Sequence, residues 1–315
     1  MLPTLRQLEY LRLLAEHGSF HRAAEAAGIG QPALSSAIQE LERILGGPVV
    51  ERIRNDVQLT PSGRAACRGG DDVLTRTKDL VEAVRQSGRR PLAGPLRLGV
   101  IPTVAPFLLP AAATRLRNAY PELQLFLREA ATDRLTVELR AGKLDCAIIA
   151  LPYDIGAFER ASIGYDEFVA AAPSDHAFVG LNAIPVEALR SDELILLERG
   201  HCLRDQVLAA LGGDFDPGSA GFAASSLHTL AYMIASGSGV SAIPALAVGG
   251  GITQGAGLVL RGFATPAPRR EIVLVWRCGW PRALDARLLA GVLKGVTMSL
   301  VASGTVSSDP ELPGD

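Results

Sequence analysis

Residues 19–45 read SFHRAAEAAGIGQPALSSAIQELERIL and decide the fold of the N-terminal part of the chain. Ser19 is the expected N-cap of a helix over Phe20–Ala27, and Gly28-Ile29-Gly30 ends that helix. A second helix over Gln31–Leu45 begins with proline in its first turn. Two helices joined by a short glycine turn predict a helix-turn-helix.

The second helix of this pair offers its first turns to DNA. In a helix-turn-helix, the N-terminal residues of the second helix contact base edges in the major groove. The candidate DNA-binding residues there are Gln31, Pro32, Ser35 and Ser36, with Gln31, Ser35 and Ser36 as base readers. The residues expected to face the protein core are Leu34, Ile38, Leu41 and Leu45. Helix pairs with glycine turns also occur in ordinary bundles, so the pair alone leaves DNA binding open.

The segments on both sides complete a winged form of this motif. Residues 5–17 place leucines and an alanine on one helical stripe. Val49–Thr60 alternates like two strands joined at an Asn-Asp turn, a wing that would carry Arg52 and Arg54 toward phosphate or the minor groove. Residues 1–65 hold seven arginines and seven acidic residues, so DNA contact depends on the local placement of arginines.

A long helix is predicted after the wing, from Pro61 to about Gln86. Its apolar stripe consists of Val73, Thr77, Leu80, Val81 and Val84. Packing against the same helix of a second subunit would form a dimer, and the alternative is that the stripe packs on its own domain. Gly69 and Gly70 each cost about 1 kcal/mol relative to alanine, so the helix could be interrupted there.

Length and composition fit a soluble protein of two or three domains, with 315 residues, 48% hydrophobic and 20% charged, and a net charge of −2. The N-terminus lacks the apolar core of a signal peptide. The uncharged stretch Leu230–Leu260 contains Pro244 and a triple glycine, which argues against a membrane span. The cysteines lack the spacing of a metal site or a disulfide framework. We therefore expect a cytoplasmic protein without membrane segment, metal or cofactor.

A second domain is predicted beyond Ser87–Pro95, whose composition is typical of a hinge. Strands such as Phe168–Ala172 then alternate with helices such as His201–Leu211, which predicts an α/β domain of about 200 residues with two lobes around a cleft. The predicted parts are a winged helix-turn-helix at 1–60, a linker and dimerisation helix at 61–90, a hinge at 91–95, an effector domain at 96–301 and a disordered tail at 302–315.

The segment 198–206, ERGHCLRDQ, sets Cys202 among charged residues at the start of a predicted helix. Arg199, His201, Arg204 and the positive helix end would lower the pKa of the thiol and make it reactive toward an oxidant. The alternative is that Cys202 only fills space, since free cysteine is among the most buried residue types.

Short motifs of the N-terminal region closely resemble the LysR-type transcriptional regulators. They are Ser19-Phe20, Ala23-Ala24, Gln31-Pro32-Ala33-Leu34-Ser35, Glu51-Arg52 and Leu59-Thr60-Pro61-Ser62-Gly63. The resemblance implies a winged helix-turn-helix, a dimerising linker helix and an effector domain of two Rossmann-like lobes that resembles periplasmic binding proteins. It also implies promoter DNA and RNA polymerase as partners, and assembly as a homodimer or homotetramer.

Within that family, the effector region resembles the OxyR-type hydrogen peroxide sensors. The segments that carry this resemblance are 94–104, 142–146, 200–206 and 244–248. The residues that match the sensors' site are Cys202 as the peroxidatic cysteine, Thr103, Thr132, His201 and Asp205 as residues that line or support its pocket, and Arg270 as an associated basic residue. Arg204 could supply a further donor. The implied function is peroxide sensing that controls antioxidant genes, as an activator.

One departure from that resemblance concerns the second cysteine. The two-cysteine sensors carry a resolving cysteine nine residues after the peroxidatic one, and Leu211 stands there. Three outcomes remain for an oxidised Cys202: a persistent sulfenate, a cap from glutathione or another small thiol, or a disulfide with a distant or intersubunit cysteine. Cys146 is expected to be buried and inert, and neither Cys67 nor Cys278 is placed to resolve Cys202.

Two other functions stay open. The effector domain could bind a small anionic metabolite, with Thr103 and Ser225-Ser226 at helix N-termini holding its carboxylate and Cys202 incidental. An enzyme such as a cysteine hydrolase is the third possibility, but His201 adjoins Cys202 in sequence and no Asn or Asp partner is evident to orient it. We therefore predict a regulator and not an enzyme.

Overall fold

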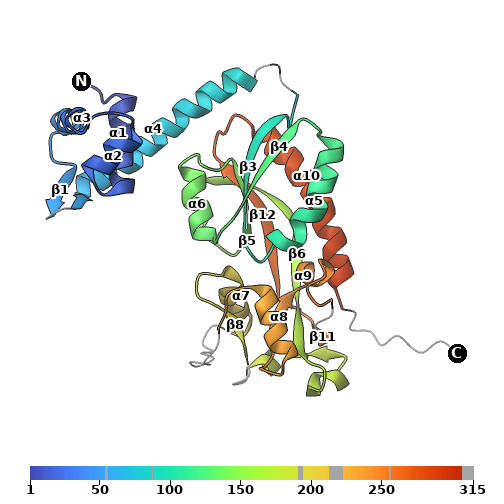
Figure 1. Cartoon of the computed structure of the whole chain (residues 1–315). Coiled ribbons are helices and arrows are strands. Elements are labelled where there is room, and N and C mark those ends of the chain that lie inside the picture. The colour runs from blue at the N-terminus through green and yellow to red at the C-terminus, as the bar shows by residue number, and fades with distance from the viewer. Residues whose placement is uncertain are drawn as a thin grey trace. The chain divides into compact units, whose positions relative to one another are not determined.

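The computed structural model describes residues 1–53, 56–86, 88, 90–190, 194–212, 223–254 and 257–306. The chain divides into two compact units, shown in Figure 1. The first consists of residues 1–88 with 140–142, and the second of residues 89–139 with 143–315.

Three helices form the core of the N-terminal unit: α1 (Leu5–His17), α2 (Phe20–Ala26) and α3 (Gln31–Leu45). The bounds of α1 and α3 agree with the sequence prediction, and α2 ends one residue earlier. Leu34, Ile38 and Leu41 are buried against α1 and α2 as predicted. The prediction for Leu45 was wrong, because this last residue of α3 lies beyond the helix contacts and is 46% exposed.

The predicted wing is an antiparallel pair, β1 (Val50–Ile53) and β2 (Asp56–Leu59). The chain then enters α4 (Pro61–Gln86), where the Thr60 hydroxyl accepts the Gly63 N–H at 2.9 Å and donates to the Pro48 carbonyl at 2.7 Å. The possible interruption at the paired glycines does not occur, and α4 runs through Gly69 and Gly70 as one helix (Figure 1).

One sheet of eight strands organises the second unit, in the order β4-β3-β5-β12-β6-β11-β7 with β10 also paired to β6. The strands are β3 (Gly94–Val100), β4 (Leu123–Glu129), β5 (Cys146–Leu151), β6 (Phe158–Pro173), β7 (Ala183–Ile184), β10 (Ser241–Pro244), β11 (Leu258–Phe263) and β12 (Arg269–Arg277). A separate parallel pair consists of β8 (Leu196–Leu197) and β9 (Ala223–Ala224).

The long strand β6 belongs to both lobes of this unit. Its first half pairs with β12, and its second half, from Phe168, pairs with β10 and β11. Figure 1 shows α5 and α6 with the strands of one lobe, and α7 and α8 in the other. The helices are α5 (Ala105–Ala119), α6 (Thr132–Arg140), α7 (Cys202–Ala210), α8 (Leu227–Ala235), α9 (Ala245–Gly249) and α10 (Ala283–Gly304).

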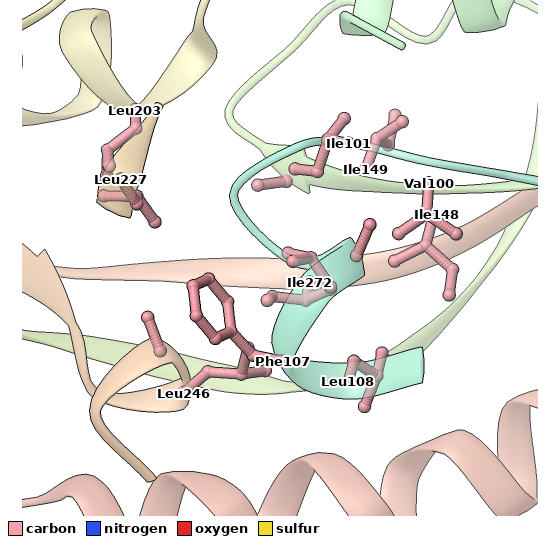
Figure 2. Close-up of a cluster of buried hydrophobic side chains, with 14 of the residues drawn as sticks. Val100, Ile101, Phe107, Leu108, Ile148, Ile149, Leu203, Leu227, Leu246 and Ile272 are labelled. Carbon is pink, nitrogen blue, oxygen red and sulfur yellow. The ribbon is translucent and has the colours of Figure 1, made fainter. Parts of the chain in front are cut away.

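A single hydrophobic core joins the two lobes. Figure 2 shows Phe107 and Leu108 of α5 in the same cluster as Leu203 of α7 and Leu227 of α8. Burial of these side chains stabilises the lobes as one body.

The helix α10 differs from the predicted boundary of the tail. It continues through Gly304, so residues 302–304 are helical and do not belong to a tail, and the remainder from residue 307 lies outside the described residues. Among the described residues, α10 is the one helix long and apolar enough to cross a membrane. Leu289 and Leu293 on this helix are buried in the core of the unit, as expected of a core helix of a folded domain.

Candidate functional site

Cys202 is the first residue of α7. Gly200 precedes it with a φ of 100°, a left-handed conformation that favours glycine, and His201 is the N-cap residue. Leu203 and Val207 on the other face of α7 are buried and anchor the helix. The half-buried thiol of Cys202 packs against the edge of the core.

Two buried side chains act on the Cys202 thiol from other elements. Thr132 begins α6, and its buried hydroxyl makes no hydrogen bond among the described residues but lies close enough to the thiol to lower its pKa. Arg270 of β12 contributes a positive charge. Burial nevertheless raises the pKa of the Cys202 thiol above its ordinary value, while Arg270 and Thr132 oppose that rise. The sequence prediction of a lowered pKa was therefore wrong, because desolvation outweighs the favourable neighbours.

A buried network fixes Arg270. Its Nη1 donates to the Thr103 hydroxyl at 2.9 Å, and its Nε donates to Asp166 Oδ2 at 3.0 Å. Asp166 Oδ1 accepts the Leu246 N–H at 2.8 Å. Burial raises the pKa of Asp166, and the Arg270 guanidinium opposes this. The network holds the guanidinium near Cys202 with its donors already oriented.

Asp166 was missed at the level of sequence. It lies on β6 and is fully buried, with its carboxylate paired to Arg270. The available signal was the position of this acid two residues before the apolar run that begins at Phe168. An acid beside a buried strand is expected to pair with a cation, because buried acids are almost always paired.

A pocket of about 470 Å³ opens beside Cys202. Arg269 and Asp205 contribute one charge of each sign to its wall. The Arg269 guanidinium lies over the Tyr165 ring, 4.8 Å from its centroid, and this contact orients it. The lining residues are Pro152, Tyr153, Phe168, Cys202, Asp205, Gln206, Ala209, Ala210, Pro268 and Arg269.

The candidate site residues do not all converge on the thiol. Thr132, Asp205 and Arg270 act on it, and Thr103 reaches it through Arg270. Arg204 instead donates to the Leu197 carbonyl at 3.2 Å, and neither it nor His201 is among the described residues that line the pocket.

Two of the hydroxyls proposed for an anionic metabolite, those of Thr103 and Ser226, already have partners. Thr103 Oγ1 accepts from Arg270, and Ser226 Oγ accepts the Thr229 N–H at 3.1 Å as the cap of α8. Among the described residues, no cluster of side chains suits a metal ion.

Leu211, at the position of the absent resolving cysteine, is buried at the end of α7. Its carbonyl accepts the Arg190 Nε–H at 2.8 Å. All four cysteines are free. Cys146 on β5 is fully buried, and burial raises its pKa well above the ordinary value, as expected of an inert thiol. Cys278 is exposed in the turn after β12.

The start of α3 presents the candidate DNA-binding residues. Gln31, Pro32 and Ser36 are exposed and Ser35 is half-buried, while the opposite face of the helix packs in the core. Arg52 lies on β1. Arg54 lies outside the described residues.

Comparison with known families agrees with this arrangement. Residues 89–297 match the LysR substrate binding domain, and residues 5–64 match the bacterial regulatory helix-turn-helix protein, lysR family. The chain belongs to the LysR family. Membership confirms the predicted helix-turn-helix and two-lobed effector domain of a LysR-type regulator, and it indicates a transcription factor and not an enzyme.

This LysR-type regulator is similar to OxyR proteins over most of its length. It is 40% identical over 280 residues to the DNA-binding transcriptional dual regulator OxyR of Escherichia coli (strain K12), over 88% of this chain and 90% of that one. Full-length OxyR from Pseudomonas aeruginosa with one cysteine replaced by aspartate has a TM-score of 0.73 and 34% identity, over 93% of this chain and 98% of that one. A cysteine-to-serine OxyR mutant from Corynebacterium glutamicum with hydrogen peroxide bound has a TM-score of 0.67 and 30% identity, over 98% of each chain.

Proposed function

We propose that this LysR-type regulator senses hydrogen peroxide through oxidation of Cys202 and controls antioxidant genes. The observation that carries the proposal is a cysteine, Cys202, at the wall of an open pocket, with the fixed charge of buried Arg270 and the hydroxyl of Thr132 close enough to favour its thiolate. Similarity to OxyR proteins supports it, including similarity to one with hydrogen peroxide bound. The regulator acts in the cytoplasm on promoter DNA.

The chemistry requires a thiolate and donors for the oxygen that leaves. The Cys202 thiolate attacks one peroxide oxygen, so an S–O bond forms while the O–O bond breaks. The departing hydroxide takes a proton and leaves as water. The Thr132 hydroxyl and the Arg270 guanidinium hold the peroxide and stabilise the developing negative charge. Because burial raises the pKa of the thiol, these two groups supply the stabilisation that the thiolate needs.

Oxidation changes the charge and polarity at the start of α7, which biases the arrangement of the effector lobes. A dimer or tetramer carries this change to paired DNA-binding units. Gln31, Ser35 and Ser36 read bases, whereas Arg52 and Arg54 contact phosphate or the minor groove. RNA polymerase then responds at the promoter.

Replacement of the thiol tests the proposal. We expect Cys202→Ser to abolish the transcriptional response to peroxide, because serine cannot be oxidised to a sulfenic acid. Cys278→Ser, which changes an exposed cysteine, is the matched control and should retain the response. Reporter transcription before and after peroxide is the measurement. A normal response in Cys202→Ser would exclude thiol sensing, and a response to an organic acid alone would favour metabolite sensing.

A further inference from the structure

In the proposed function, on which this inference rests, the guanidinium of Arg270 holds the peroxide beside the thiol of Cys202. Such a group must be fixed in place, because an arginine side chain is long and rotates about several bonds. Arg270 and Asp166 are both fully buried in the second unit, so solvent does not compete for either charge. The protein partners of the guanidinium therefore decide where its donors point.

We propose that Asp166 is a positioning residue for the reaction of Cys202 with peroxide and that it acts through Arg270. Its Oδ2 accepts the Nε–H of Arg270 at 3.0 Å and lies 2.9 Å from Nη2, so the carboxylate holds one edge of the guanidinium. On the other side, Nη1 donates to the Thr103 hydroxyl at 2.9 Å. This hydrogen bond uses one of the two N–H groups of Nη1, and the second can serve as the donor for peroxide.

A carboxylate is the group that fits between the two donors that Asp166 meets. Its Oδ1 accepts the N–H of Leu246 in α9 at 2.8 Å, while its Oδ2 accepts from Arg270. An asparagine has one oxygen and one NH₂ group, and its NH₂ would face one of these donors. A neutral side chain of the same size therefore loses one of the two partners and releases either the guanidinium or α9.

The effect of Asp166 on the thiol is indirect. The side chains that most affect the pKa of Cys202 are Arg270, Thr132 and Asp205. Asp166 is not among them, although its own carboxylate is paired with Arg270. Replacement of Asp166 should therefore change the reaction by moving the guanidinium, and not by removing a charge that the thiol experiences directly.

A second buried ion pair of the same construction provides a matched control. Asp285 on α10 accepts from Arg282 Nε at 2.7 Å, and its other oxygen accepts the Leu92 N–H at 3.0 Å. Both acids are buried in the second unit. Neither Asp285 nor Arg282 lines the pocket beside Cys202. Asp285→Asn therefore opens a buried ion pair of the same kind at a place that does not act on the thiol.

The experiment compares two reactions of Cys202 in the full-length protein, oxidation by hydrogen peroxide and alkylation by iodoacetamide. Mass spectrometry of the peptide that contains Cys202 follows both reactions. Both consume the same thiolate, so its ionised fraction cancels in the ratio of the two rate constants. Only the reaction with peroxide needs a donor for the leaving group, because iodide leaves without a proton. We expect this ratio to fall roughly tenfold in Asp166→Asn, the scale of one charge-assisted hydrogen bond, and to keep its wild-type value in Asp285→Asn.

Two further variants separate the position of Arg270 from the charge of Asp166. Asp166→Glu keeps the charge but moves the carboxylate by one methylene group, so it should also lower the ratio, and it serves as the test if Asp166→Asn does not fold. Arg270→Gln should lower the ratio as well. Addition of Asp166→Asn to Arg270→Gln should lower it no further, because the two residues act as a unit.

Three results would overturn the inference while leaving peroxide sensing intact. They are a wild-type ratio in Asp166→Asn or Asp166→Glu, a further fall in the double variant below Arg270→Gln, and an equal fall in Asp285→Asn. If peroxide forms no sulfenate on wild-type Cys202 while iodoacetamide still alkylates it, the proposed function fails first and the inference fails with it.

Discussion

Two opposing effects act on the thiol of Cys202: burial disfavours its charged form, and neighbouring groups favour it. Desolvation raises the pKa of the thiol, whereas Arg270 and the Thr132 hydroxyl stabilise the thiolate. The fraction of Cys202 that is ionised at neutral pH is therefore smaller than for a free cysteine. In the proposed function, peroxide held by the same donors would meet the thiolate where it is most stable.

The role of Thr132 can be tested through the pH dependence of oxidation. Thr132→Val removes a hydroxyl that favours the thiolate, so the pKa of Cys202 should rise further and less thiolate should be present at neutral pH. We expect the profile of sulfenate formation against pH to move to higher pH and the rate at pH 7 to fall roughly fivefold, equivalent to about 1 kcal/mol for one hydrogen bond.

Two controls belong to this experiment. Thr132→Ser keeps the hydroxyl and should keep the wild-type profile. Thr136→Val removes a buried hydroxyl of the same helix that donates to the Asp133 carbonyl, and it should leave the profile unchanged. A profile that does not move in Thr132→Val would show that the hydroxyl does not act on the thiolate.

The sequence predicted part of this site. Cys202 stood out by its charged neighbours, and Thr103, Thr132 and Arg270 followed from resemblance to peroxide sensors. Spacing along the chain suggested Arg204 as a member of the site, but its side chain binds a backbone carbonyl. Spacing gave no sign of Asp166, which lies on a distant strand and binds Arg270. The direction of the pKa change of Cys202 could not be predicted from the sequence either, because it depends on how deeply the thiol is buried.

At the level of elements, a close approach of α4 to the wing explains the glycine in Thr60-Pro61-Ser62-Gly63. A Cβ on Gly63 would lie 1.8 Å from the Val49 carbonyl oxygen, so only glycine fits without a shift of the backbone. Gly69 on the same helix has nothing within 4 Å of the place of a Cβ. One glycine is therefore required by packing, and the other only weakens the helix.

This contrast predicts opposite effects of the same substitution. Gly63→Ala should destabilise the N-terminal unit by about 1–3 kcal/mol, as overpacking does. Gly69→Ala should stabilise it by about 0.5–1 kcal/mol, because alanine loses less conformational freedom in a helix. Thermal unfolding of the full chain, with hydrogen exchange in residues 1–60, measures both. Changes of the same sign in the two variants would contradict the assignment.

The periodicity of apolar residues was sufficient to predict the helices that bury one face, and it was a weaker guide to the other elements. The bounds of α1 and α3 agree with the prediction. Only the apolar second half of β6 was predicted, since its first half mixes charged and apolar residues where it crosses between lobes. The short helix α9 was not predicted, because its residues are apolar on every face and show no periodic pattern.

At the scale of the whole molecule, α4 exposes the apolar stripe that its sequence predicts. Leu80 is 65% and Val84 69% exposed in the single chain, and Val73 and Val81 are also exposed. The stripe therefore does not pack on its own domain. We expect such an exposed apolar stripe on a long helix to contact another helix, and the same helix of a second subunit offers a matching stripe.

A charge placed in this stripe should separate the subunits. Leu80→Glu would bury an unpaired carboxylate at the contact between subunits. Desolvation of this charge opposes association, so we expect the dimer dissociation constant to rise more than about tenfold. Lys78→Glu changes an exposed residue outside the stripe and should leave assembly unchanged. Sedimentation measures the mass of each variant, and DNA binding should weaken with dissociation because two reading units must act together. A dimeric Leu80→Glu protein would place the subunit contact elsewhere on the chain.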